Sequence, residues 1–135
     1  MFWVKIILLI VAALSVLLYA VYHLAAGIIG WRLSRRLKRA REQGEDWVIL
    51  THEAHECGMQ GEYEKQIQLA EKAIELNPGA SEARRLIGNS YEFLGDEAQQ
   101  TGDCEQAAEY HQKATEAWNR AKEINPKIMV PGYRE

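Results

Sequence analysis

The first 41 residues of this 135-residue chain contain no aspartate or glutamate, although they contain seven lysines and arginines. Residues 42–135 contain nine basic residues against nineteen acidic ones, so the net charge of −3 is made of +7 followed by −10. The charges are therefore sharply segregated along the chain, and the overall net charge is misleading. The length allows one soluble domain at most.

Cysteine is scarce as well: the chain has two, Cys57 and Cys104, and they do not form a CxxC pair. Their spacing argues against a disulfide framework or a zinc site and fits a reducing compartment. The sequence also lacks a P-loop, a dinucleotide fingerprint and a GxSxG motif. We therefore predict a protein that is not an enzyme, with no catalytic residues and no cofactor.

One short motif is similar to a zinc site. His52-Glu-Ala-His55 resembles HExxH but is one residue shorter, whereas metalloprotease chemistry needs the two histidines four residues apart. At a spacing of three, the two rings could still share a metal with Glu56 or Cys57. Polar residues on a helix surface are the better interpretation, so we predict no metal site.

Charge is nearly absent from residues 4–29, where Lys5 is the single charged residue and fifteen residues are Leu, Ile or Val. About 20 apolar residues cross the hydrocarbon core, and these fifteen favour insertion by about 5–9 kcal/mol. Trp3 and Trp31 would lie about 42 Å apart along a helix, which suits the two headgroup zones. We predict a transmembrane anchor, because the apolar core of a cleaved signal peptide is shorter.

Basic residues follow this span, whereas only Lys5 and the amino terminus precede it. The positive-inside rule therefore predicts an outside N-terminus and a cytoplasmic C-terminal part. A bacterial inner membrane is the expected location, with the mitochondrial outer membrane as the alternative. The residues expected at the membrane interface are Trp3, Trp31, Arg32, Arg35, Arg36, Lys38 and Arg39.

The basic stretch continues a helical pattern through Leu33, Leu37 and Ala40, so the anchor helix is expected to reach about Gln43, before Gly44. Anionic lipid headgroups are possible ligands of these basic residues. Nucleic acid is not expected as a partner, because no aromatic platform accompanies the basic run.

Two segments further along carry apolar stripes at helical spacing. In the later segment Gly88 lies within the first stripe, where the missing side chain lets a second helix approach, and Trp118 is placed beside that crossing. Asn125-Pro126 ends the second helix. The striped residues are Leu86, Ile87, Tyr91 and Leu94, then Ala114, Trp118 and Ala121.

The earlier segment repeats this plan. A break at Met59-Gln-Gly61 separates its two stripes, and Leu76-Asn-Pro78 ends it much as Ile124-Asn-Pro126 ends the later copy. Its striped residues are Trp47, Leu50, Ala54 and Cys57, then Tyr63, Ile67, Ala70, Ala73, Ile74 and Leu76.

Together the two copies resemble the tetratricopeptide repeat (TPR), whose pattern runs W-x2-L-G-x2-Y, then A-x3-F, then a closing proline. The first copy has Ala54 and Cys57 in place of the glycine and tyrosine. The resemblance implies an all-α fold of two helix hairpins, which follow the transmembrane helix predicted from the apolar run. The expected divisions are an anchor at 1–31, a basic linker at 32–46, repeats at 47–80 and 81–126, and a tail at 127–135.

The second copy is longer than the first. Ala54 to Pro78 spans 24 residues, whereas Gly88 to Pro126 spans 38. A turn at Thr101-Gly-Asp103 divides the excess into about seven residues per helix, roughly two helical turns, so both apolar faces stay aligned. We expect helices near 81–100 and 103–125. A kink at Gly95 with a short extra helix is the alternative.

TPR arrays bind partners on the concave surface lined by the first helix of each repeat, so the resemblance implies a groove. Arg85 and Asn89 are similar to half of the pair by which some members clamp a terminal carboxylate, but the first copy has Thr51 and His55 there. Phe93 falls off the apolar stripe and is either a groove anchor or a core residue under the longer helix. The candidate groove residues are Val48, Thr51, His55, Met59, Glu82, Arg85, Asn89, Glu92 and Phe93.

These features predict a single-pass membrane protein that displays a TPR interaction module on the cytoplasmic face. It would act by binding another protein, as an adaptor, receptor or assembly factor. The alternative is an accessory structural subunit whose anchor helix packs into a larger membrane complex.

Overall fold

The computed structural model describes residues 2–131, with side chains from residue 14 onward. Within that range the chain forms five α-helices and no strand, which confirms the predicted all-α class. The chain divides into two compact units, Met1–Arg39 and Ala40–Glu135.

The first helix, α1 (Phe2–Gln43), continues without a break through the apolar run and the basic residues after it. It ends where Gly44 adopts a φ of +69°, a conformation that glycine takes without steric cost. The helix therefore reaches Gln43, as predicted. Of the described helices, α1 alone is long and apolar enough to span a membrane by length and composition, over residues 14–43.

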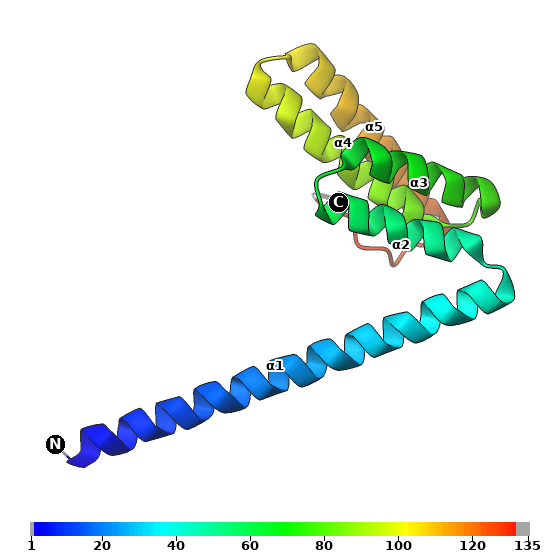
Figure 1. Cartoon of the computed structure of the whole chain (residues 1–135). Helices are drawn as coiled ribbons and strands as arrows, with labels where there is room; N and C mark the ends of the chain where they lie inside the picture. Colours follow the sequence, from blue (N-terminus) through cyan, green and yellow to red (C-terminus); the bar gives the residue numbers. More distant parts are fainter. Residues whose placement is uncertain (1, 132–135) are drawn as a thin grey trace. The chain divides into compact units, whose positions relative to one another are not determined.

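Four shorter helices follow: α2 (Asp46–Met59), α3 (Tyr63–Leu76), α4 (Ser81–Thr101) and α5 (Cys104–Ile124). Each packs on the next, and α2 also contacts α4. The result is two stacked helix hairpins, α2–α3 and α4–α5 (Figure 1). This arrangement is consistent with a TPR array.

Small residues allow these helices to approach closely. Ala54, Ala70, Ala73 and Ala83 are fully buried where the helices cross, and Leu86 is 2% exposed beside them. Larger, partly buried side chains surround this cluster and complete the core. They are Trp47, Leu50, Leu69, Ile74 and Ile87.

The two hairpins end in the same local structure. Asn77 and Asn125 are both extended, with φ/ψ of −139°/97° and −135°/93°, because a following proline disfavours helical backbone. Each asparagine side chain then accepts a hydrogen bond from the backbone N–H two residues on, at 2.9 Å and 3.2 Å. The repeated Asn-Pro ending inferred from the sequence is thus a repeated three-dimensional turn.

The second hairpin is seven residues longer in each helix, because α4 and α5 have 21 residues each and α2 and α3 have 14. Its turn lies at Gly102, which has a φ of +86°, and the Asp103 carboxylate then accepts a bond from the Gln106 N–H at 3.0 Å. Helix α4 passes Gly95 without a break. The predicted turn is confirmed, and the alternative of a kink at Gly95 is wrong.

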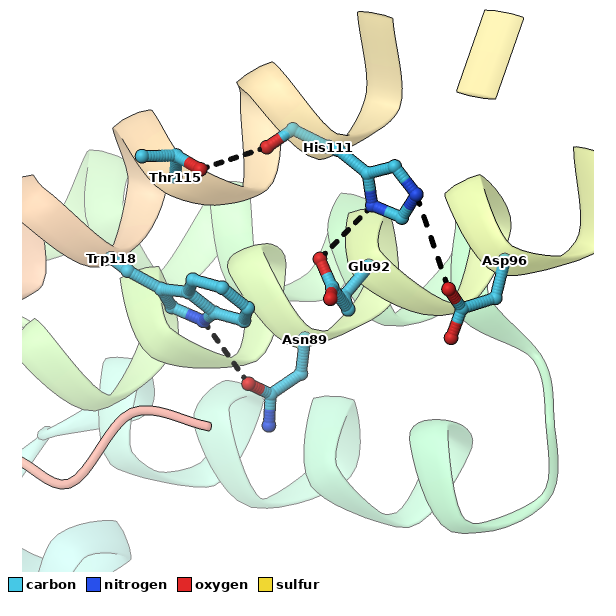
Figure 2. Close-up of polar contacts among 6 residues, drawn as sticks. All are labelled: Asn89, Glu92, Asp96, His111, Thr115 and Trp118. Atoms are coloured by element: carbon cyan, nitrogen blue, oxygen red, sulfur yellow. Dashed lines mark hydrogen bonds and ion pairs between the residues drawn. The ribbon is translucent and has the colours of Figure 1, made fainter. Parts of the chain in front are cut away.

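A ring that packs on a glycine joins α4 to α5. A Cβ added at Gly88 would lie 2.3 Å from Trp118 Cδ1, so the indole occupies the space that a side chain would need. Trp118 is 6% exposed, and its Nε1–H donates to Asn89 Oδ1 at 3.1 Å (Figure 2). The buried indole therefore satisfies its one polar group.

The same arrangement recurs at Gly95 and His111, seven residues after Gly88 in α4 and seven before Trp118 in α5. A Cβ added at Gly95 would lie 2.7 Å from His111 Cε1. The ring of His111 lies between two carboxylates of α4, with Nδ1 3.1 Å from Glu92 and Nε2 3.9 Å from Asp96 (Figure 2). A second contact between a glycine and a ring thus lies two helical turns from the first, and its ring is the more polar of the two.

Replacement of Trp118 by alanine is expected to lower the free energy of unfolding by about 3–5 kcal/mol, since it removes a buried aromatic and leaves a cavity. Gly88→Leu should destabilise as well, because its side chain would collide with the indole. Urea denaturation of the full chain in detergent, followed by circular dichroism, measures both. Asn119→Ala, at the exposed neighbouring position, is the control. Wild-type stability of both variants would contradict this packing.

Candidate functional site

A hollow of about 190 Å³ opens between α2, α3 and α4. We call it the groove. The end of α2, the start of α3 and the middle of α4 contribute to it, so it exists only when the two hairpins stack. It is lined by His55, Gly58, Met59, Tyr63, Gln66, Arg85, Leu86, Asn89 and Phe93.

One lining residue, Gln66, belongs to a buried polar pair. Ser90 Oγ donates to Gln66 Oε1 at 2.7 Å, and the two side chains are 0% and 4% exposed. Gln66 lies against Gly58, where an added Cβ would be 2.3 Å from its amide oxygen. This bond holds α3 to α4 in one register, because a buried amide without a partner is costly.

Exposed apolar side chains form one edge of the groove. Phe93 stacks on Tyr63 with ring centroids 5.0 Å apart and planes 6° from parallel. Phe93 is nevertheless 52% exposed, and Met59 on α2, which lines the same groove, is 73% exposed. A large aromatic held in place but left open to solvent is typical of a binding surface.

The polar side of the groove is held in place by contacts outside it. The Asn89 carbonyl is engaged by the Trp118 N–H, so the donor end of its amide is the one left for a ligand. Arg85 is paired with Glu82 through two hydrogen bonds, one of them 2.9 Å long. The hydrogen bond to Glu82 raises the pKa of Arg85, which stays charged.

The structure brings together five of the nine groove residues predicted from the sequence: His55, Met59, Arg85, Asn89 and Phe93. The other four lie elsewhere. Val48 and Thr51 are buried in α2, each 9% exposed, and the Thr51 hydroxyl donates to the Trp47 carbonyl. Glu82 lies beside Arg85 without lining the groove, and Glu92 faces α5 at His111.

Four groove residues were missed by the sequence analysis. Tyr63 was assigned to an apolar stripe, and Leu86 to the core. Gly58 and Gln66 had no assignment, although Gln66 lies three residues after Tyr63 and four before Ala70, at the spacing of the apolar stripe of α3. A buried position for a polar residue within that stripe was the available signal.

The predicted interface residues on α1 divide similarly. Trp31, Arg32, Arg35, Arg36 and Arg39 line one shallow hollow of about 280 Å³. Lys38 does not line it, and the side chain of Trp3 lies outside those described.

The side chains whose ligand atoms lie close enough to share a metal ion are not those of the HExxH-like motif. Among the side chains described, Glu92, Asp96 and His111 have ligand atoms within 4.8 Å of one another. His52 is half-buried and His55 is exposed on α2, and neither belongs to this group. His111 of α5 contacts the two carboxylates of α4, so the geometry of these three residues supports a structural contact between the helices.

A larger hollow of about 480 Å³ lies between α3, α4 and α5. Its charged lining residues are three glutamates and three basic residues, so no net charge selects a ligand there. Its aromatic side chain, Tyr91, already stacks with Tyr110, with centroids 5.9 Å apart. The groove is the stronger candidate, because two of its large apolar side chains, Met59 and Phe93, are mostly exposed to solvent.

No protein-family model matches the chain, and no solved structure matches it. Curated proteins do. The chain is 35% identical over 66 residues to the Photosystem I assembly protein Ycf3 of Prochlorococcus marinus subsp. pastoris, covering 49% of this chain and 38% of that protein. The protein of the same name from Rippkaea orientalis is 30% identical over 70 residues, covering 52% and 40%.

Each of these relatives is named an assembly protein. The chain spans about two fifths of the length of the curated relatives it matches. The similarity therefore supports a role in binding other proteins. It applies to the part of the chain that the match covers.

Phe93→Ala is expected to lower the free energy of unfolding by only about 1 kcal/mol, mainly through the lost ring stacking on Tyr63. The matched control is Leu86→Ala on the same helix, which removes a side chain that is 2% exposed and should cost about 2–5 kcal/mol. Urea denaturation of both variants tests this difference. An equal loss would assign Phe93 to the core.

Proposed function

We propose that this chain is a membrane-anchored interaction module that binds a segment of another protein in the groove and acts in the assembly of a membrane complex. The observation that carries the proposal is the exposed Phe93–Tyr63 stack beside the oriented amide of Asn89. The names of the similar assembly proteins support the same class of function.

The groove supplies the two kinds of contact that a protein ligand needs. Met59 and Phe93 offer apolar surface that an inserted side chain would cover, which gives affinity. Asn89 and Arg85 offer hydrogen-bond donors in fixed directions, which gives orientation. Both sets are in place before binding, so little ordering cost opposes association.

The charge of the helical array indicates which charge the bound segment should carry. From residue 42 onward the net charge is −10, so the module attracts basic segments and repels acidic ones. An amphipathic helix or extended segment with basic residues, and with one apolar side chain to meet Phe93, fits these requirements.

In this proposal α1 is the anchor. Its exposed apolar side chains would face lipid, and the six basic residues after the span would keep the groove on the cytoplasmic side. The module would thereby be confined to the membrane surface, where subunits of a membrane complex are assembled.

A second function is favoured by one feature of α1. His23 contacts the rings of Tyr19 and Tyr22, with centroids 4.3 Å and 5.7 Å away, inside an apolar segment. Polar groups within a span often face another helix. The chain would then be an accessory subunit held by α1, and partner capture would be lost when residues 4–29 are exchanged for an unrelated apolar span.

Binding in the groove is tested with a photo-crosslinking amino acid at Met59 of the full chain in its own cells. We expect a specific adduct that Phe93→Ala weakens by roughly 30-fold, since a central aromatic contributes about 2 kcal/mol. The control position is Asn119, exposed on α5. Equal adducts from both positions, or an adduct that Phe93→Ala leaves unchanged, would contradict the groove as the binding site.

Orientation is tested with the natural cysteines. Burial raises the pKa of the Cys57 thiol, so less thiolate is present near neutral pH and alkylation is slow, whereas Cys104 is exposed. A membrane-impermeant maleimide should label neither thiol in intact cells and Cys104 after permeabilisation. Cys104→Ser should remove that label. Labelling of Cys104 in intact cells would place the module outside.

A further inference from the structure

Five residues on one side of α1 form a continuous surface next to the apolar span. Trp31, Arg32, Arg35, Arg36 and Arg39 line the same shallow hollow of about 280 Å³. We call this surface the arginine stripe. At about 100° of helix per residue these positions fall within an arc of roughly 140°, whereas Leu33, Leu37 and Ala40 fall on the opposite side of the helix.

Charge count alone does not account for this surface. The positive-inside rule treats lysine and arginine alike and is indifferent to helix face. Here five of the six basic residues after the span are arginines, and four of those share one face. Arginine presents a planar fork of donors that matches the oxygens of a phosphate, which lysine does not.

The tryptophan orders this surface. Arg35 Cζ lies 4.0 Å from the centroid of the Trp31 ring, so the guanidinium stacks on the indole. A cation held over an aromatic face keeps its charge, so Arg35 can still attract an anion. Trp31 is 56% exposed, and no acidic residue precedes Glu42, so the positive field of the stripe is not neutralised within residues 1–41.

The position of the stripe next to the apolar span indicates that a phosphate ligand would come from a lipid headgroup. It begins one residue after Gly30, where the apolar run ends, and extends about 12 Å along the helix to Arg39. The headgroup region on one side of a bilayer is about 5–8 Å deep. With α1 as the proposed anchor, the stripe passes through the layer where lipid phosphates lie.

We propose that the arginine stripe is a binding site for the phosphate groups of anionic phospholipids. The inference rests on the membrane anchoring in the proposed function and adds a lipid ligand to it. Trp31 and Arg35 would sit at the first phosphates, while Arg36 and Arg39 would reach further headgroup oxygens. The module would thus prefer membrane regions rich in anionic lipid.

The test is native mass spectrometry of the full chain in detergent, titrated with phosphatidylglycerol and with phosphatidylcholine. Arg36→Gln with Arg39→Gln removes two charges from the stripe. Lys38→Gln with Arg41→Gln removes the same charge outside it. We expect the first pair to weaken phosphatidylglycerol binding at least about tenfold, at roughly fivefold per residue, and the second pair to weaken it clearly less.

Equal weakening in both pairs would overturn the site and leave only a general charge effect. Equal binding of the two lipids by the wild type, or tighter binding of a short single-stranded RNA than of phosphatidylglycerol, would overturn it too. Both variants keep four basic residues after the span. Labelling of Cys104 and crosslinking from Met59 therefore report separately on the proposed anchoring and on the groove.

Discussion

The packing of the Trp118 ring on Gly88 is the contact on which the module depends. It sets how closely α4 and α5 approach, and its N–H determines which way the Asn89 amide points. Asn89, which follows Gly88 in α4, also lines the groove. A core interaction thus orients a surface donor, so stability of the second hairpin and shape of the groove cannot vary independently.

The first hairpin supplies the other half of the groove. The Ser90–Gln66 bond and the alanine-rich crossing hold α3 against α4, which brings Tyr63 under Phe93. Without the stacked neighbour, Phe93 would be an ordinary exposed aromatic. The seven added residues in each helix of the second hairpin leave this junction unchanged, because two whole turns return every side chain to its face.

The two units differ in the sign of their charge. The basic part of α1 has one arginine face beside an apolar segment, and the helical array carries the excess of acid. The two proposed ligands differ accordingly: anionic phosphate for the stripe and a basic protein segment for the groove. Opposite charge keeps each ligand from competing for the other site.

The sequence by itself determined the helices, the two-copy plan, the turn at Gly102 and the place of Trp118, since periodicity, glycine and proline act within a few residues of chain. The nine candidate groove residues came instead from the resemblance to TPR arrays, and five of them line the hollow. Only the tertiary structure decided that Val48 and Thr51 are buried, that Gln66 pairs with Ser90, that Phe93 stacks on Tyr63, and that His111 lies between two carboxylates. These outcomes depend on the crossing of helices distant in sequence, which no local pattern encodes.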